Sequence, residues 1–520
     1  MEVENDVGPP AFMLESDISG LCSDASWLAT VDGVHWRSAK LATEIDHSNL
    51  SGKVATPFRS LLDRGTEILL LFALGMMTAF VGPRMLSDKY KKYALPTFRL
   101  MLLATLGCIY WHNFPLVSYA TGMDVSSHYA YLDYLLSKRS LPSAYDGWQM
   151  FQPPFTYLLN ALVINVVHIF APDVSLEASA RSVTMGIALL TAYFGSRAVE
   201  VALGDRGIVQ WFGVALAIAM PVAIYMAHTF GNEPYFAFLG VMIFYWIICH
   251  MDAKKNYSGL KEWTALGILC GLALLAKVTA LILCAVVVLV LLRAQIRNGR
   301  RWHEIWKLFG VYCFWIVLIA GWWYLRNFME YGRPFIGGWE SRPGMEWWQY
   351  PGYRSLGNLY EFGGVLAHSI YAGVSSFLDG VYSSLWGDGY LSGIVQFASA
   401  PHWNFKGMQS LYLLALPIMF AIAVGMIRVL SKQKSGALGI ALEFSALGLI
   451  LLLGAMFYMY ATIPIYSSAK ASYMLVLVPG IAILAAWGIE PFDRTPISRI
   501  VIAGFMAVWV GSVYSSFIAV

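Results

Sequence analysis

Long apolar stretches separated by short polar connections fill the chain from about residue 67 to its end. A helix needs about 20 apolar residues to cross the hydrocarbon core of a bilayer, and thirteen stretches reach or approach that length. We therefore predict an all-α polytopic membrane protein with about 13 transmembrane or re-entrant helices, whose extracytoplasmic loops carry interfacial helices. The predicted helices cover residues 67–82, 99–118, 154–171, 182–203, 209–227, 234–251, 264–276, 278–294, 308–325, 410–430, 440–461, 471–489 and 499–519.

The start of the chain differs from everything that follows. Residues 1–65 are polar, rich in Asp, Glu and Ser, and have no sustained hydrophobic period, so we expect a poorly ordered segment. Residues 57–64 have some amphipathic character and suit a helix at the membrane interface. A small regulatory segment is the alternative. The chain thus divides into a polar segment, 1–65, and a transmembrane domain, 66–520.

The amino-acid composition also indicates that the protein is embedded in a lipid bilayer. Hydrophobic residues make up 58% of the chain and charged residues 13%, which is about half the charged fraction of a soluble protein. The net charge of +3 gives no case for nucleic acid as a partner. The six cysteines lie mostly inside apolar stretches without C-x-x-C spacing, so neither a disulfide framework nor a zinc site is expected.

Four connections rich in Lys and Arg set the expected orientation, because such loops stay on the cytoplasmic side. The helix at 99–118 then runs outward and places the loop 119–153 on the extracytoplasmic face. The loop 327–408 is the second long extracytoplasmic element. The four basic connections lie at residues 84–99, 254–261, 293–307 and 428–434.

Two places do not fit a simple succession of spans. Residues 264–294 form one apolar stretch between two basic loops, so we predict a hairpin of two short helices with Lys277 near its outer apex. Three apolar stretches separate Asp124 from Glu233, and three full crossings would leave these carboxylates on opposite sides of the membrane. We expect one of the three, at 154–171, 182–203 or 209–227, to be short, re-entrant or tilted along the interface.

The loop 119–153 carries the richest chemistry. A helix over residues 124–136 would place Asp124, His128 and Tyr131 on one face, because they are spaced i, i+4 and i+7. A carboxylate and an imidazole just outside the hydrocarbon indicate catalysis at a membrane surface. The structural alternative is that Asp124 only caps a surface helix.

Several motifs accompany this loop along the chain. The run from Asp124 to Leu135 reads D-x-x-x-H-Y-A-Y-L-x-Y-L. The later elements are Phe151-Gln-Pro-Pro154, His228–Pro234, Leu274–Thr279, Trp323–Pro334 and Ser468–Pro479. Together they resemble bacterial polytopic glycosyltransferases with the GT-C fold, the group that includes protein O-mannosyltransferases and the aminoarabinose transferase of lipid A. One departure is Val125, where many members of that group have a second acid.

The resemblance implies a sugar donor linked to a polyprenyl phosphate, with a glycan, lipid or protein as acceptor and membrane lipids as further partners. It also implies the bacterial inner membrane, with the site on the extracytoplasmic face. Such a transfer needs a base near the attacking hydroxyl, and Asp124 suits that role. His128 suits contact with the acceptor or the phosphate. Glu233 suits orienting the acceptor or binding a divalent metal, and the sequence leaves metal dependence open.

Cations are needed to hold the departing phosphate. Arg326 offers a planar fork for phosphate oxygens, and Lys277 and Lys470 offer point charges. Two of them have structural alternatives, because Arg326 can hold its helix at the headgroups and Lys277 can extend to the interface. All three cations are predicted on the same side of the membrane as Asp124, and this joint placement favours a role in the site over the structural alternatives.

Candidates for contact with the acceptor or the sugar are aromatic or polar residues of the two extracytoplasmic loops and of a late connection. Aromatic rings bind sugar faces, although Trp and Tyr also gather at bilayer interfaces. These candidates are Tyr131, Trp339, His368, Asp388 and Tyr466.

Two other functions stay open at this point. A transporter also has many helices and rare intramembrane charges, but the two halves of this chain show no internal repeat. A glycan polymerase or ligase would use the same donor chemistry with a different acceptor. The sequence identifies neither the sugar nor the acceptor.

Overall fold

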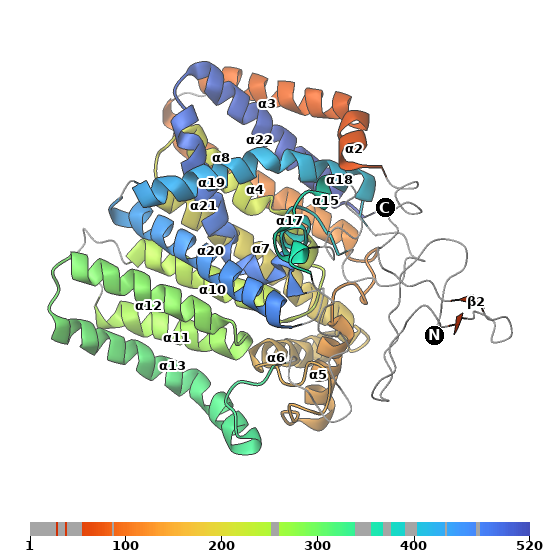
Figure 1. The fold of residues 1–520 in the computed structure, drawn as a ribbon, viewed down its shortest axis with the longest axis vertical. Helices are drawn as coiled ribbons and strands as arrows, with labels where there is room; N and C mark the ends of the chain where they lie inside the picture. The colour runs from red at the N-terminus through yellow and green to blue at the C-terminus, as the bar shows by residue number, and fades with distance from the viewer. Residues whose placement is uncertain are drawn as a thin grey trace.

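The computed structural model is a bundle of long helices (Figure 1). It describes residues 28–29, 37–38, 55–85, 88–250, 259–337, 355–367, 376–390, 403–431, 434–463 and 468–519. The prediction of an all-α membrane protein is confirmed within these residues, where the strands are two residues each: β1 (Leu28–Ala29) pairs antiparallel with β2 (Arg37–Ser38).

The first half of the bundle brings the chain to the region of the predicted site. Its helices are α2 (Pro57–Asp63), α3 (Gly65–Met85), α4 (Asp88–Asn113), α5 (Val125–Lys138), α6 (Phe155–Phe170), α7 (Leu176–Leu203), α8 (Ile208–Ile218), α9 (Pro221–Met226) and α10 (Asn232–His250).

The second half packs around the same core. Its helices are α11 (Leu260–Ala276), α12 (Ala280–Arg297), α13 (Trp302–Tyr331), α14 (Gly357–Tyr360), α15 (Gly364–Ala367), α17 (Phe377–Trp386), α18 (Phe405–Leu414), α19 (Leu416–Ser431), α20 (Gly436–Thr462), the 3₁₀ helices η3 (Ala471–Leu477) and η4 (Glu490–Phe492), α21 (Val478–Ile489) and α22 (Pro496–Ser516).

Every predicted apolar stretch contains helix, but the count of about 13 spans is not confirmed. Among the described residues, eleven helical stretches are long and apolar enough to cross a membrane, whereas α6 is a shorter apolar helix. The stretches α8–α9 and η3–α21 are almost entirely buried, while α3 faces outward along most of its length. The core therefore lies around α8, α10 and α21.

The position of Arg181 explains how the chain avoids an odd number of crossings between the two acidic residues. This fully buried guanidinium, in the second turn of α7, donates to the carbonyls of Phe114, Val117 and Ser118 just after α4. The end of α4 and the start of α7 therefore lie on the same side. The intervening α5 and α6 stay on that side, so the short segment is the one predicted at 154–171.

The predicted hairpin within residues 264–294 is present. Helix α11 ends at Ala276, Lys277 adopts an extended conformation, and α12 begins at Ala280. The two helices pack against each other and against neighbouring spans. Lys277 thus occupies the break between them, as expected.

Ion pairs gather at the end of the bundle opposite to this break, where the connections from α12 to α13 and from α19 to α20 lie (Figure 1). All but Arg197–Glu200, which lies within α7, join segments that are distant in sequence. These pairs are Arg99–Glu200, Arg197–Glu200, Arg206–Glu490, Arg428–Glu490 and Arg297–Glu443. Several of these arginines belong to the basic connections from which the cytoplasmic side was predicted.

The predicted interfacial helix at 57–64 is α2, which packs against α18. Asp63 pairs with Lys406 at 3.1 Å, while Phe58 and Leu62 are exposed. A helix with exposed apolar side chains on one face and an ion-paired polar face is typical of a helix that lies at the membrane surface.

The two ends of the bundle should be distinguishable by labelling intact cells. Ser126 on α5 and Asn298 after α12 are both exposed, and they lie at opposite ends of the bundle. A cysteine at Ser126 should react with a membrane-impermeant thiol reagent added outside, whereas one at Asn298 should react only after permeabilisation. Labelling is measured above that of the unsubstituted chain. The reverse pattern would place the site on the cytoplasmic face.

Candidate active site

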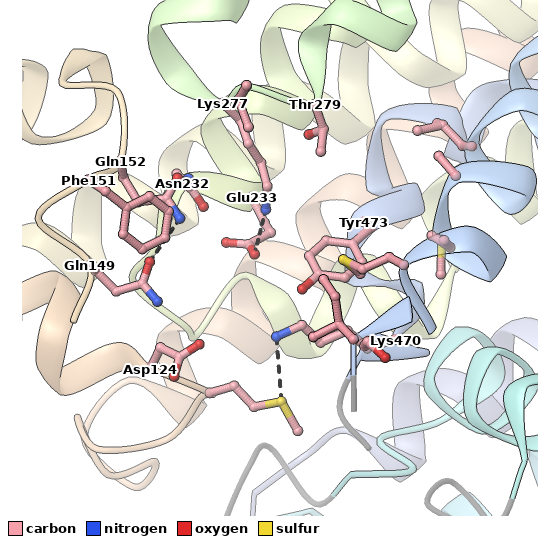
Figure 2. A pocket seen from close by; sticks show the side chains of 18 of the residues that line it. Asp124, Gln149, Phe151, Gln152, Asn232, Glu233, Lys277, Thr279, Lys470 and Tyr473 are labelled. Atoms are coloured by element: carbon pink, nitrogen blue, oxygen red, sulfur yellow. Dashed lines mark hydrogen bonds and ion pairs between the residues drawn. The ribbon is translucent and has the colours of Figure 1, made fainter. Parts of the chain in front are cut away.

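A cavity of about 230 Å³ opens where several helix ends meet (Figure 2). Asp124 directly precedes α5, Glu233 lies in the first turn of α10, Lys277 follows α11 and Lys470 precedes η3. All four residues line this cavity, together with His128. The structure thus brings both predicted acidic residues, the predicted histidine and two of the three predicted cations to one place.

Asp124 is presented to the cavity by an unusual backbone conformation. It occupies the N-cap position of α5 with a φ of 59°, in the left-handed region, and its side chain makes no capping hydrogen bond. Its Oδ1 instead accepts from Nε1 of Trp148 at 3.0 Å. The alternative that Asp124 only caps a helix therefore does not describe its side chain, which is exposed and held by an aromatic donor.

The turn before Asp124 depends on Gly122. Its φ of 129° is rarely adopted by L residues. A Cβ at this position would overlap the Cγ2 of Thr229 and lie 2.9 Å from its Oγ1. The glycine therefore lets the loop 119–124 pass directly against the segment that leads into α10, which brings Asp124 toward Glu233.

His128 is buried beside Tyr157. Its Nδ1 lies 2.6 Å from the hydroxyl of Tyr157, and the two rings stack. Burial lowers the pKa of His128 to about 4, although the carboxylates of Glu233 and Asp124 act in the opposite direction. A Cβ on Gly231 would lie 3.4 Å from Nε2 of His128 and 3.2 Å from Oε2 of Glu233, so these two side chains face the same small space.

Glu233 and Lys277 form an ion pair across the cavity wall, with Nζ 2.7 Å from Oε1. Both side chains are largely buried, at 14% and 8% exposure. A carboxylate and an ammonium in such a place are stable only when they compensate each other. The pair also joins the start of α10 to the break between α11 and α12.

Lys470 has a different environment. Its Nζ lies 3.6 Å from Sδ of Met123 and 5.2 Å from the ring centroid of Tyr473, which also lies 4.7 Å from Nζ of Lys277. No carboxylate of the described residues lies within ion-pair distance of Lys470. Burial favours its neutral amine, but Tyr473, Asp124 and Glu233 outweigh this effect and raise the pKa of Lys470 above its usual value. The cavity therefore contains a cation without a paired anion.

Beyond the charged groups, the cavity continues along apolar side chains. They come from α12 and from the last turns of α20. The main ones are Ile282, Leu452, Ala455, Met456, Met459 and Ile463. Unbranched, polarisable methionines adapt to irregular apolar ligands. The site thus has a charged end and an apolar end.

Arg326 is not among the residues that line the cavity. Its Nε lies 2.9 Å from Oε1 of Glu330, and its Nη2 donates to the carbonyl of Pro142 at 2.9 Å. This guanidinium joins α13 to the loop 119–153 and lies over the ring of Trp323. The predicted contact with a phosphate therefore does not follow from its position, because Arg326 does not line the cavity and its Nε and Nη2 already donate to other groups.

Of the candidates for sugar contact, Tyr131 is fully buried and stacks on Tyr157 at 3.8 Å between ring centroids, so it is a packing residue between α5 and α6. Asp388 lines a smaller adjoining cavity of about 40 Å³, where its Oδ2 accepts from Nε1 of Trp403. Trp339, His368 and Tyr466 lie outside the described residues.

Several residues of the cavity were not predicted. Trp148, Gln149 and Gln152 belong to the loop 119–153, Asn232 precedes Glu233, and Tyr473 follows Lys470. Their proximity in sequence to predicted site residues was the available signal. Side-chain direction within an irregular loop was not readable from hydrophobic periodicity, so they were missed. Among the described residues, no group of three or more His, Cys, Asp or Glu side chains is arranged to hold a metal ion.

Comparisons with known proteins give weak similarities. No family model and no curated protein matches the chain. The structure of ArnT from Cupriavidus metallidurans bound to undecaprenyl phosphate overlaps with 77% of this chain and 60% of its own, at 13% identity and a TM-score of 0.45. ArnT in the apo state overlaps with 79% of this chain and 78% of its own, at 14% identity and a TM-score of 0.35. This chain spans 60% of the length of the lipid-bound ArnT chain, and at these scores the likeness assigns no function.

The role of Gly122 can be tested by stability. Gly122→Ala should lower the free energy of unfolding by about 1 to 3 kcal/mol from backbone strain alone, with the overlap on Thr229 adding to it. Thermal unfolding in detergent is the measurement. Gly186→Ala in α7, where a Cβ meets nothing within 4 Å, is the matched control and should not destabilise. Equal melting temperatures for the two variants would show that the turn does not need glycine.

Proposed function

We propose that this protein is a membrane glycosyltransferase that moves a sugar from a polyprenyl-phosphate donor to a hydroxyl of an extracytoplasmic glycan, lipid or protein. The observation that carries the proposal is the cation Lys470, which has no carboxylate within ion-pair distance among the described residues and lines the same cavity as the apolar side chains of α12 and α20. A phosphate attached to a long apolar chain satisfies both ends of this cavity. The motif resemblance to GT-C glycosyltransferases points to the same donor class.

The proposed arrangement places the donor phosphate at Lys470, with Lys277 as the second cation beside Tyr473. Lys277 is paired with Glu233, so Lys470 is the main cation for the phosphate. Lys277 contributes as a second, partly neutralised positive charge. Cations fixed in a partly dry site stabilise the negative charge that develops on the departing phosphate. Arg326 has a structural role in this arrangement, because it joins α13 to the catalytic loop.

The reaction is a single displacement at the anomeric carbon. The acceptor oxygen attacks this carbon and its O–H proton passes to the carboxylate of Asp124. The bond between the anomeric carbon and the phosphate oxygen breaks, and its electron pair leaves with the polyprenyl phosphate. One displacement inverts the configuration at the anomeric carbon. Trp148 holds Asp124 through Oδ1, which leaves Oδ2 for the acceptor hydroxyl.

The placement of the site favours an enzyme over a transporter. The charged residues lie at helix ends on one side of the bundle, next to α5, which does not cross it. A transporter binds its solute near the middle of the membrane, usually between repeated halves. A glycan polymerase or ligase would share the donor end of the cavity, and it differs from the proposed enzyme only in its acceptor.

Loss of the base should separate catalysis from binding. Asp124→Asn keeps the shape of the side chain but removes the proton acceptor, so transfer should fall by about 100-fold or more, while binding of the donor lipid is retained. Asp133→Asn is the matched control, because Asp133 is exposed on the same helix away from the cavity. Transfer is measured as release of polyprenyl phosphate from polyprenyl-phosphate hexose in membrane vesicles that carry the native acceptors. An Asp124→Asn variant that retains more than about a tenth of the activity would exclude Asp124 as general base.

A further inference from the structure

Three side-chain amides form a hydrogen-bonded chain along one wall of the cavity. Nδ2 of Asn232 donates to Oε1 of Gln152 at 2.8 Å, and Nε2 of Gln152 donates to Oε1 of Gln149 at 2.8 Å. Both bonds run in the same direction, so the two glutamine carbonyls are occupied. Nε2 of Gln149 is the donor left at the end of the chain, and among the described residues it has no hydrogen-bond partner.

The other end of the amide chain also lacks a partner. Oδ1 of Asn232 is buried and accepts no hydrogen bond from the described residues. The two end residues are themselves almost fully buried, with Gln149 6% exposed and Asn232 1% exposed. Leaving a buried polar group unsatisfied is destabilising, so a wall built in this way indicates a polar ligand.

The amide chain lies between the base and the leaving-group cations. Gln149 follows Trp148, which holds Asp124, and Asn232 precedes Glu233, which is paired with Lys277. Figure 2 shows Gln149, Gln152 and Asn232 on one side of the cavity, with Asp124, Glu233 and Lys470 around the same space. A sugar in transit between phosphate and acceptor must occupy this interval.

We propose that the amide chain recognises the transferred sugar, with Nε2 of Gln149 donating to a hydroxyl oxygen of a sugar that is uncharged at that position. This inference rests on the proposed function. Gln152 and Asn232 are positioning residues, because they fix which end of the Gln149 amide faces the cavity.

The chemistry of the wall selects against charged sugars. An ammonium group has only donors and cannot accept a hydrogen bond from Nε2 of Gln149. A carboxylate can accept this bond, but it would lie close to the carboxylate of Asp124 and be repelled. A hydroxyl is uncharged and both donates and accepts.

Binding of two lipid probes tests this inference on the purified full-length protein. The probes are undecaprenyl phosphate and undecaprenyl phosphate carrying glucose. Gln149→Met keeps the length of the side chain and removes the donor, so affinity for the glucose-bearing lipid should fall roughly 3- to 10-fold, the loss expected for one hydrogen bond. Affinity for the sugar-free lipid should not change. Gln152→Met should cause the same selective loss by releasing Gln149.

The matched control is Gln210→Met. Gln210 is also buried, but it lies on α8 and donates to the carbonyl of Glu200, away from the cavity. This variant should bind both lipids as the wild type does. A change at Gln149 that affects both lipids equally, or neither, would overturn the sugar contact and leave the donor proposal intact. Wild-type protein that binds neither lipid would overturn both proposals. Undecaprenyl phosphate carrying a uronic acid or an amino sugar serves as a further probe, and its tighter binding would overturn the proposed preference for an uncharged sugar.

Discussion

The ion pair between Glu233 and Lys277 is the contact on which the site depends. Each charge is largely removed from water, and removing one partner from such a pair leaves an uncompensated charge at a cost of roughly 3 to 5 kcal/mol. The pair joins the start of α10 to the break between α11 and α12. Because Lys277 neutralises Glu233, the positive charge of Lys470 needs a different anion.

The remaining geometry brings loop residues to this pair. Arg181 holds the end of α4 next to the start of α7, which keeps α5 and α6 on the side of the cavity. Gly122 allows the preceding loop to contact Thr229, and the left-handed conformation of Asp124 turns its carboxylate away from the helix it precedes. Helix ends supply the charged groups, while α20 supplies an apolar surface. This arrangement suits an amphiphilic substrate.

Much of the fold could be predicted from the sequence, because each membrane-crossing helix must be about 20 apolar residues long. The odd number of stretches between Asp124 and Glu233 correctly indicated a segment that does not cross, and the basic residues around 264–294 correctly indicated a hairpin at Lys277. The count of about 13 transmembrane or re-entrant helices is not confirmed, because hydropathy alone does not distinguish a short apolar helix such as α6 from one that crosses the membrane.

The gathering of charged residues at the cavity was predicted in part, whereas their roles stay predictions. Charged residues near helix ends are recognisable from the sequence, so Asp124, His128, Glu233, Lys277 and Lys470 were all expected in the site. Two other candidates do not line the cavity, because lining it depends on side-chain direction. Arg326 lies at the expected helix end but turns to Glu330, and Tyr131 shares the face of His128 but packs into the core. The amides of the cavity wall were missed for the same reason.

The most direct test of this account is mass spectrometry of the lipid that copurifies with the protein. Wild-type protein should retain a polyprenyl-phosphate lipid, and Lys470→Gln should lose it because its phosphate no longer has a cation, whereas the exposed control Lys138→Gln should retain it. Retention of the same lipid by Lys470→Gln, or recovery of a soluble solute in place of a phosphate-bearing lipid, would contradict the account.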